Sequence, residues 1–156
     1  MRLKDLLSGD VIRIPLKNTE KNAIIEEMID ILDKAGKLKD KKAVSKAVLE
    51  REQVMSTGMG DGIAIPHAKT DGVEKLIAAF GLTKEPVDFK SIDNKPVRII
   101  FLLVGPTDLT SPHLKVLSRI SRLTHRKEFR EKLAAAKNSK QVIDAITQEE
   151  QKYFVI

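Results

Sequence analysis

Residues 96–105 read PVRIIFLLVG, and this stretch decides the fold. Apart from Arg98, the residues between Pro96 and Gly105 are apolar, with no polar residue at every second position. A strand with one face in water alternates apolar and polar residues, whereas a strand covered on both faces is apolar throughout. The stretch therefore predicts a central strand with other layers packed on both sides of it.

Two further strands are expected at 62–67 (GIAIPH) and 75–82 (KLIAAFGL), and 11–16 (VIRIPL) is expected to be extended. Residues 83–96 are interpreted as turns around a short extended piece.

The three glycines of STGMGDG, residues 56–62, are typical of a flexible loop. This glycine pattern lacks the lysine and hydroxyl residue of a nucleotide-binding P-loop and leads into a strand, so that function is rejected.

Helical patterns surround these strands. A short helical turn is expected at 3–7, and a helix over 20–36 is expected to be capped by Asn18 or Thr19 and to stop at Gly36. Further helices are expected at 41–53 with Asp40 as the cap, 111–124, 126–137 and 139–151. Helices before and after buried strands predict one α/β domain over residues 1–156. Residues from about 148 to 156 are interpreted as a C-terminal tail of unknown role, and its KYFVI ending cannot be placed.

The composition limits the possible functions. The 156-residue chain has 28 basic and 22 acidic side chains, a net charge of +6, no cysteine, no tryptophan and one tyrosine. The lysines are scattered among acidic residues and there are few aromatic rings for bases to stack on, so nucleic-acid binding is not expected. The start of the sequence does not resemble a signal peptide, and no apolar run is long enough to span a membrane. Together with the absence of cysteine, this predicts a cytoplasmic location.

Arg51 interrupts an apolar face. Val44, Ala47, Val48 and Arg51 have the spacing of one helix face, so the arginine continues a stripe that should face the core. Arg51 either extends its guanidinium to solvent, which the spacing alone favours, or directs it into a site for a phosphate or carboxylate.

His113 lies at the expected start of a helix. Ser111 suits the N-cap and Pro112 the first helical position, which places His113 in the first turn on the same face as Val116 and Ile120. The residue is either a hydrogen-bonded histidine at the edge of the core or, next to a helix N-terminus, part of a phosphate-binding site.

His67 ends the apolar run IAIPH. Pro66 favours extended geometry at Ile65, so His67 is expected at the exit of a strand, where α/β proteins gather ligands. It is a candidate nucleophile, acid/base or metal ligand. No ligand spacing supports a metal site made of His67, His113 and Asp61, and neither a metal nor a cofactor is expected. His125 is interpreted as a solvated loop residue.

The segment LEREQVMSTGMGDGIAIPHAKT, residues 49–70, resembles the active-site segment of the fructose/mannitol-type enzyme IIA domains of the bacterial phosphotransferase system. LKDLL, EPVDF, PVRIIFLLVGP, the histidine that starts the next helix, and EFREKL fit the same pattern over nearly the whole chain. The resemblance implies a mixed β-sheet with helices on both faces. It also implies that His67 accepts a phosphoryl group, that His113 hydrogen-bonds it, and that Arg51 stabilises its charge.

The resemblance further implies an HPr-type phosphocarrier as donor and no cofactor. The free-standing chain is most like the nitrogen-regulatory enzyme IIA, which controls target proteins by binding them. The alternative is a sugar-permease IIA subunit that passes phosphate to a IIB cysteine. A different class, a non-catalytic basic binding module or nucleic-acid-binding regulator, is the third possibility. Because HPr-type donors have positive rims, a chain of net charge +6 is expected to place acidic or apolar groups around His67, or to use a different donor.

Overall fold

The computed structural model describes residues 2–153, and β6 (Val97–Gly105) is the central strand of its mixed sheet. The described strands follow the order β1-β5-β6-β3-β2, and β4 also pairs with β6. β1 runs parallel to β5, and β3 and β4 run parallel to β6, whereas β5–β6 and β2–β3 are antiparallel. The other strands are β1 (Ile12–Leu16), β2 (Gly58–Gly60), β3 (Ile63–Ala64), β4 (His67–Lys69) and β5 (Ile77–Val87). The predicted central strand and mixed sheet are confirmed.

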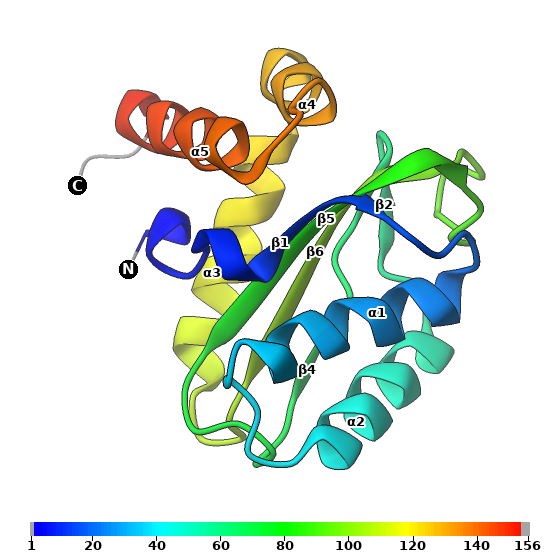
Figure 1. The fold of residues 1–156 in the computed structure, drawn as a ribbon, viewed down its shortest axis with the longest axis vertical. Helices are drawn as coiled ribbons and strands as arrows, with labels where there is room; N and C mark the ends of the chain where they lie inside the picture. The colour runs from blue at the N-terminus through cyan, green and yellow to red at the C-terminus, as the bar shows by residue number, and fades with distance from the viewer. Residues whose placement is uncertain (1, 154–156) are drawn as a thin grey trace.

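Helices cover both faces of this sheet (Figure 1), as predicted. The helices α1 and α2 lie against one face, and α3 and α4 against the other. The elements are the short turns η1 (Leu3–Asp5) and η2 (Gly9–Val11), then α1 (Lys21–Lys34), α2 (Lys41–Val54), α3 (Thr110–Thr124), α4 (Lys127–Ala134) and α5 (Ser139–Tyr153). Residues 148–153 of the expected tail therefore belong to α5, and residues 154–156 lie outside the described residues.

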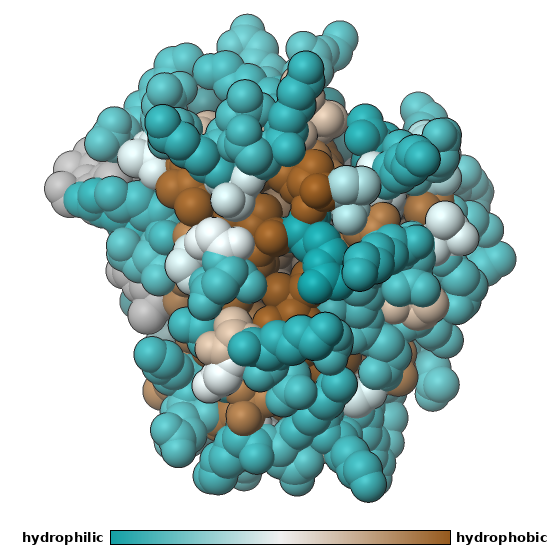
Figure 2. All heavy atoms as spheres, in the orientation of Figure 1, coloured by the Kyte–Doolittle hydropathy of each residue, from teal (hydrophilic) through white to brown (hydrophobic). Residues whose placement is uncertain are grey.

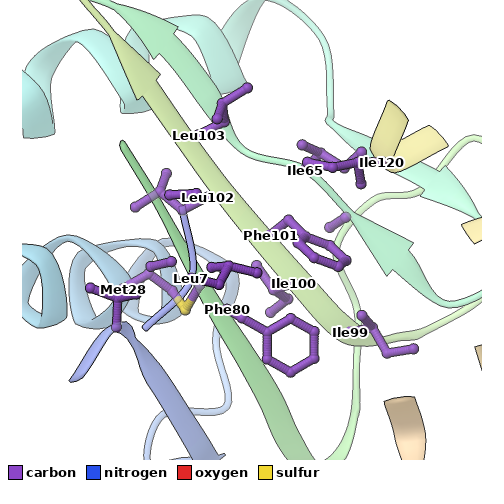
Figure 3. Packing of buried hydrophobic residues seen from close by; sticks show 14 of the residues in the cluster. Leu7, Met28, Ile65, Phe80, Ile99, Ile100, Phe101, Leu102, Leu103 and Ile120 are labelled. Carbon is purple, nitrogen blue, oxygen red and sulfur yellow. The ribbon is translucent and has the colours of Figure 1, made fainter. Parts of the chain in front are cut away.

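The core lies on both sides of β5 and β6. Phe80 and Phe101 are directly paired across these strands, with ring centroids 5.0 Å apart, and in Figure 3 Phe101 lies toward Ile120 of α3. Gly81, the residue after Phe80 in β5, faces the opposite side of the sheet. A Cβ added to it would come within 2.8 Å of the Met28 sulfur. This alternation lets one pair of strands pack against helices on both faces. Complete burial of each phenylalanine contributes about 1.5–3 kcal/mol of hydrophobic free energy.

Helix α1 is capped by a different residue from those predicted. The structure places Glu20 at the N-cap, where its carboxylate accepts hydrogen bonds from the backbone N–H groups of Asn22 and Ala23. The expectation of Asn18 or Thr19 was therefore wrong, because Asn18 donates to the carboxylate of Glu27 instead. The predicted cap of α2 is confirmed: Asp40 accepts a hydrogen bond from the Ala43 N–H.

Several element boundaries also differ from the prediction. Strand β5 continues to Val87, and the glycine-rich stretch contains the short strand β2, which pairs with β3 at the edge of the sheet. Helix α3 begins at Thr110 with Leu109 at the N-cap, so the expected Ser111 cap was wrong. The carbonyl of Leu109 already accepts the His113 N–H, which starts the helix without a side-chain cap.

The surface agrees with the charged composition. In the orientation of Figure 1, Figure 2 shows a largely hydrophilic face with apolar residues visible at its centre. Within residues 2–153, no helix is both long enough and apolar enough to cross a membrane.

Candidate active site

His67 is presented by a break between two short strands. β3 pairs with β6 at Ile63 and Ala64, and β4 resumes the pairing at His67, opposite Leu103. Pro66 lies in the break because it has no N–H to donate, and its carbonyl accepts the Leu103 N–H at 3.0 Å. His67 is therefore the first residue of β4, not the exit of a strand as predicted. The interrupted pairing still holds its backbone firmly against the central strand.

A backbone carbonyl orients the half-buried imidazole of His67. Its Nδ1 lies 2.7 Å from the carbonyl oxygen of Ile65, and because that oxygen can only accept, Nδ1 is the protonated nitrogen. The other nitrogen, Nε2, then carries the free electron pair. Burial lowers the pKa of His67 below its ordinary value, the Ile65 carbonyl opposes this, and the charge of Arg51 lowers the pKa further. The ring is therefore neutral and nucleophilic at Nε2 at neutral pH.

His113 lies next to His67. It extends from the first turn of α3, is 3% exposed, and its ring centroid lies 5.8 Å from that of His67. A Cβ at Gly105 would lie 3.2 Å from His113 Nδ1, so the glycine leaves room for the ring against β6. Among the described residues, Nδ1 of His113 is one of the few buried polar side-chain atoms without a hydrogen-bond partner. An unpartnered buried polar atom is costly, so the position of this ring calls for an explanation beyond packing.

Burial, followed by the nearby His67 and Lys69, lowers the pKa of His113 from 6.5 to about 4. On acidification, His113 therefore takes up a proton at a higher pH in the unfolded chain than in the folded protein. The free energy of unfolding decreases as a result while the pH falls from 6.5 to about 4. Over that range we expect His113 to account for a loss of about 3 kcal/mol. Urea unfolding at a series of pH values measures it. The His113→Gln variant is expected to lose less stability than the wild type on acidification, and equal losses would contradict the assignment.

Arg51 lies in the last turn of α2. The structure buries Val44, Val48 and Glu52 on this helix, at intervals of four residues, and leaves Arg51 half-buried beside them. The buried face of α2 therefore ends at Glu52, one residue after the Arg51 that the spacing predicted. The guanidinium donates from Nη1 to the carbonyl of Met55 at 2.8 Å. Its charge acts on the His67 ring. The side chain is tethered at the end of the helix and retains further N–H groups for an anion.

Sequence reasoning missed Glu52. This residue is 5% exposed, and its carboxylate accepts bonds from the N–H and hydroxyl of Thr57 and pairs with Lys21 at 2.9 Å. Its spacing of four residues from Val48 was the available signal, but a glutamate between Arg51 and Gln53 is typical of a solvated helix end. The three donor groups that satisfy it belong to two residues outside α2, Lys21 of α1 and Thr57 of the segment after α2, so its burial could be recognised only in three dimensions.

The two other residues considered in the sequence, His125 and Asp61, lie outside this site. His125 is exposed between α3 and α4, which confirms its interpretation as a solvated residue. Lys69 of β4 donates to the Thr110 hydroxyl at 3.1 Å, which ties the start of α3 to the strand that carries His67. Within residues 2–153, no three histidine or acidic side chains are grouped in a way that could hold a metal ion. Asp61 instead lies 3.9 Å from Arg130, away from the two histidines.

Residues 5–149 match the family model of the phosphoenolpyruvate-dependent sugar phosphotransferase system, EIIA 2. The chain belongs to this family. EIIA 2 domains are phosphate-carrying components of that system, and the resemblance inferred from residues 49–70 is confirmed. The paired histidines therefore lie in a domain whose family carries phosphate.

Three relatives show how far the similarity extends. The chain is 42% identical over 148 residues to the fructose-specific EIIABC component of Bacillus subtilis, covering 95% of this chain but only 23% of that protein. It is 33% identical over 147 residues to a nitrogen regulatory protein of Bradyrhizobium diazoefficiens, covering 94% and 95% of the two chains. The crystal structure of the nitrogen regulatory protein IIA-Ntr from Neisseria meningitidis superposes with a TM-score of 0.82 at 31% identity, covering 92% of this EIIA chain and 98% of that one.

Proposed function

We propose that this EIIA chain is a phosphohistidine carrier that accepts a phosphoryl group on Nε2 of His67. The observation that carries the proposal is the bond from Nδ1 of His67 to the Ile65 carbonyl, which leaves Nε2 as the nucleophilic nitrogen. A carrier of this kind needs a neutral imidazole with one fixed, unprotonated nitrogen.

The transfer is a single displacement at phosphorus. The electron pair of His67 Nε2 forms the new N–P bond, while the N–P bond of a donor phosphohistidine breaks and its electron pair returns to the donor ring. Nδ1 of His67 keeps its proton, so positive charge develops on the ring and is stabilised by the Ile65 carbonyl. Catalysis of such a transfer consists mainly of positioning and of stabilising charge on the phosphoryl oxygens.

His113 and Arg51 are the groups that we assign to those oxygens. The neutral ring of His113 can donate one hydrogen bond without adding a competing acid, because its pKa lies near 4. Arg51 supplies a permanent positive charge and a planar set of donors. The two side chains come from different helices, His113 from α3 and Arg51 from α2.

The donor that we propose is an HPr-type phosphocarrier. Apolar side chains adjoin the site in sequence, because the exposed Val54 and Met55 follow Arg51, and Leu114, which is 59% exposed, follows His113. Exposed apolar residues beside a catalytic group are typical of a surface that binds a protein partner. Apolar contacts would let a positively rimmed donor dock on a chain of net charge +6.

Incubation with phosphoenolpyruvate, enzyme I and HPr, followed by mass spectrometry, tests the proposal: one acid-labile phosphoryl group is expected.

We propose that the phosphorylation state controls the binding of target proteins, as a nitrogen-regulatory IIA would do. The similarity to the nitrogen regulatory proteins of Bradyrhizobium and Neisseria, at 33% and 31% identity, supports this assignment. The second candidate is a sugar-permease IIA that passes phosphate to a IIB cysteine, and the higher identity of 42% to the fructose-specific relative favours it. Mixing the phosphorylated chain with a fructose-type IIB domain distinguishes them: rapid loss of phosphate to the IIB cysteine would support the sugar branch and contradict the regulatory one.

The Arg51→Lys variant is expected to accept phosphate about tenfold more slowly than the wild type. Lysine keeps the charge but loses the planar fork that can bond two phosphoryl oxygens at once. Quench-flow measurement of the initial rate with phosphorylated HPr gives the ratio. Lys46→Ala, on an exposed face of α2, is the control and is expected to leave the rate unchanged. An unchanged rate in Arg51→Lys would mean that the arginine serves only to cap its own helix.

A further inference from the structure

A line of hydrogen bonds links a buried carboxylate to the proposed nucleophile. It begins at Glu52 in the last turns of α2, whose carboxylate pairs with Lys21 of α1 and accepts both the N–H and the hydroxyl of Thr57. Glu52 and Thr57 are 5% and 6% exposed. A buried carboxylate bonded to three donors is held in one orientation, so it fixes the segment that follows α2.

The line continues through the backbone to the imidazole. The carbonyl of Thr57 accepts the N–H of Ile65 at 3.0 Å, and the carbonyl of Ile65 faces Nδ1 of His67 at 2.7 Å. Thr57 therefore anchors the peptide whose carbonyl selects the tautomer of His67. Movement of Thr57 away from Glu52 would shift that carbonyl and loosen the orientation of the ring.

The charge of Glu52 also reaches the ring. The charged side chains of α2 that act on His67 are Arg51, which lowers its pKa, and Glu52, which raises it, while His113 on α3 is neutral at neutral pH. Positive charge develops on His67 as its Nε2 bonds to phosphorus. A carboxylate held nearby stabilises that charge and offsets the effect of Arg51.

We propose that Glu52 is a positioning residue for phosphoryl transfer: through Thr57 it holds the Ile65 carbonyl in place, and its charge supports the ring of His67 during the reaction. The inference rests on the proposed function, because it assumes that His67 is the acceptor. It assigns a role in the reaction to a side chain that touches neither the phosphoryl group nor the nucleophile.

Two substitutions separate the two effects. Glu52→Gln keeps the shape and an acceptor for Thr57 but removes the charge, whereas Thr57→Val keeps the backbone link and removes the hydroxyl that Glu52 holds. Glu27→Gln is the matched control, since Glu27 is 7% exposed, pairs with Arg13 and accepts backbone N–H groups, but does so on α1 without any bond toward His67.

The measurements are the initial rate of phosphoryl acceptance at saturating phosphorylated HPr and ¹⁵N NMR of the His67 ring in the unphosphorylated protein. We expect Glu52→Gln to lower the rate about tenfold, because the positive charge that develops on the ring loses its carboxylate partner, and to lower the pKa of His67. Thr57→Val is expected to slow acceptance and to populate the other tautomer of His67. Glu27→Gln should change neither measurement.

Wild-type rates and ring signals in both Glu52→Gln and Thr57→Val would overturn the inference. An equal effect of Glu27→Gln would also overturn it, because the loss would then reflect stability alone. If Glu52→Gln does not fold, the tautomer shift in Thr57→Val decides the question. If the wild-type protein accepts no phosphate on His67, the proposed function fails, whereas the NMR comparison still shows whether Glu52 acts on this ring.

Discussion

The His67→Ala variant is expected to accept no phosphoryl group while keeping the fold of the wild type. The imidazole is the only nucleophile that we assign to the site, so its removal eliminates the N–P bond instead of weakening it. The fold should persist because His67 is half-buried at the break between β3 and β4 and makes one side-chain bond, to the Ile65 carbonyl. Mass spectrometry after incubation with phosphoenolpyruvate, enzyme I and HPr measures the loss, and circular dichroism checks the fold.

The exposed His125 provides the control for this experiment. His125→Ala removes a histidine from the turn between α3 and α4 and is expected to be labelled at the wild-type rate. Labelling that persists in His67→Ala would contradict the assignment. In that case the neighbouring His113 would be the acceptor.

The second large effect is expected at His113. His113→Ala should slow phosphoryl acceptance about a hundredfold, which is the usual consequence of removing one hydrogen-bond donor aimed at charge that develops in a transition state. The ring is preorganised for this role because it is buried against Gly105 and held in the first turn of α3. Rapid-quench kinetics with phosphorylated HPr give the rate.

Substitution of a buried ring can also disturb packing, so the rate in His113→Ala needs a structural check. His113→Gln keeps a hydrogen-bond donor and most of the volume, and we expect it to recover part of the lost rate. The ¹⁵N signals of His67 should remain those of the Nδ1-protonated tautomer in both variants. A wild-type rate in His113→Ala would show that this histidine is only a core residue at the edge of the sheet.

The layered fold could be predicted from sequence because its strongest signals are long. The continuous apolar run of β6 and the apolar faces of α1 and α3 each extend over many residues, and tertiary packing rarely overrides such patterns. Local signals were less reliable. Asn18 was a reasonable helix cap by residue type, but its side chain and N–H donate to Glu27, and Glu20 caps α1 in its place.

The site was only partly predictable for a related reason. His67 and His113 were selected because each broke a local pattern, and the structure brings their rings to 5.8 Å although they are far apart in the sequence. The orientation of His67 depends on the Ile65 carbonyl, which no side-chain motif encodes. Glu52 escaped notice because its burial arises from Lys21 and Thr57, which come from other segments and meet it only after folding.

The most direct test of the account is to locate the phosphorus atom itself. Long-range ¹H–¹⁵N and ³¹P NMR of the ¹⁵N-histidine-labelled, phosphorylated chain identifies both the residue and the ring nitrogen that carries the group. We predict coupling between phosphorus and Nε2 of His67, with Nδ1 still protonated and bonded to the Ile65 carbonyl. Phosphorus on Nδ1 of His67, or on either nitrogen of His113, would contradict the central claim.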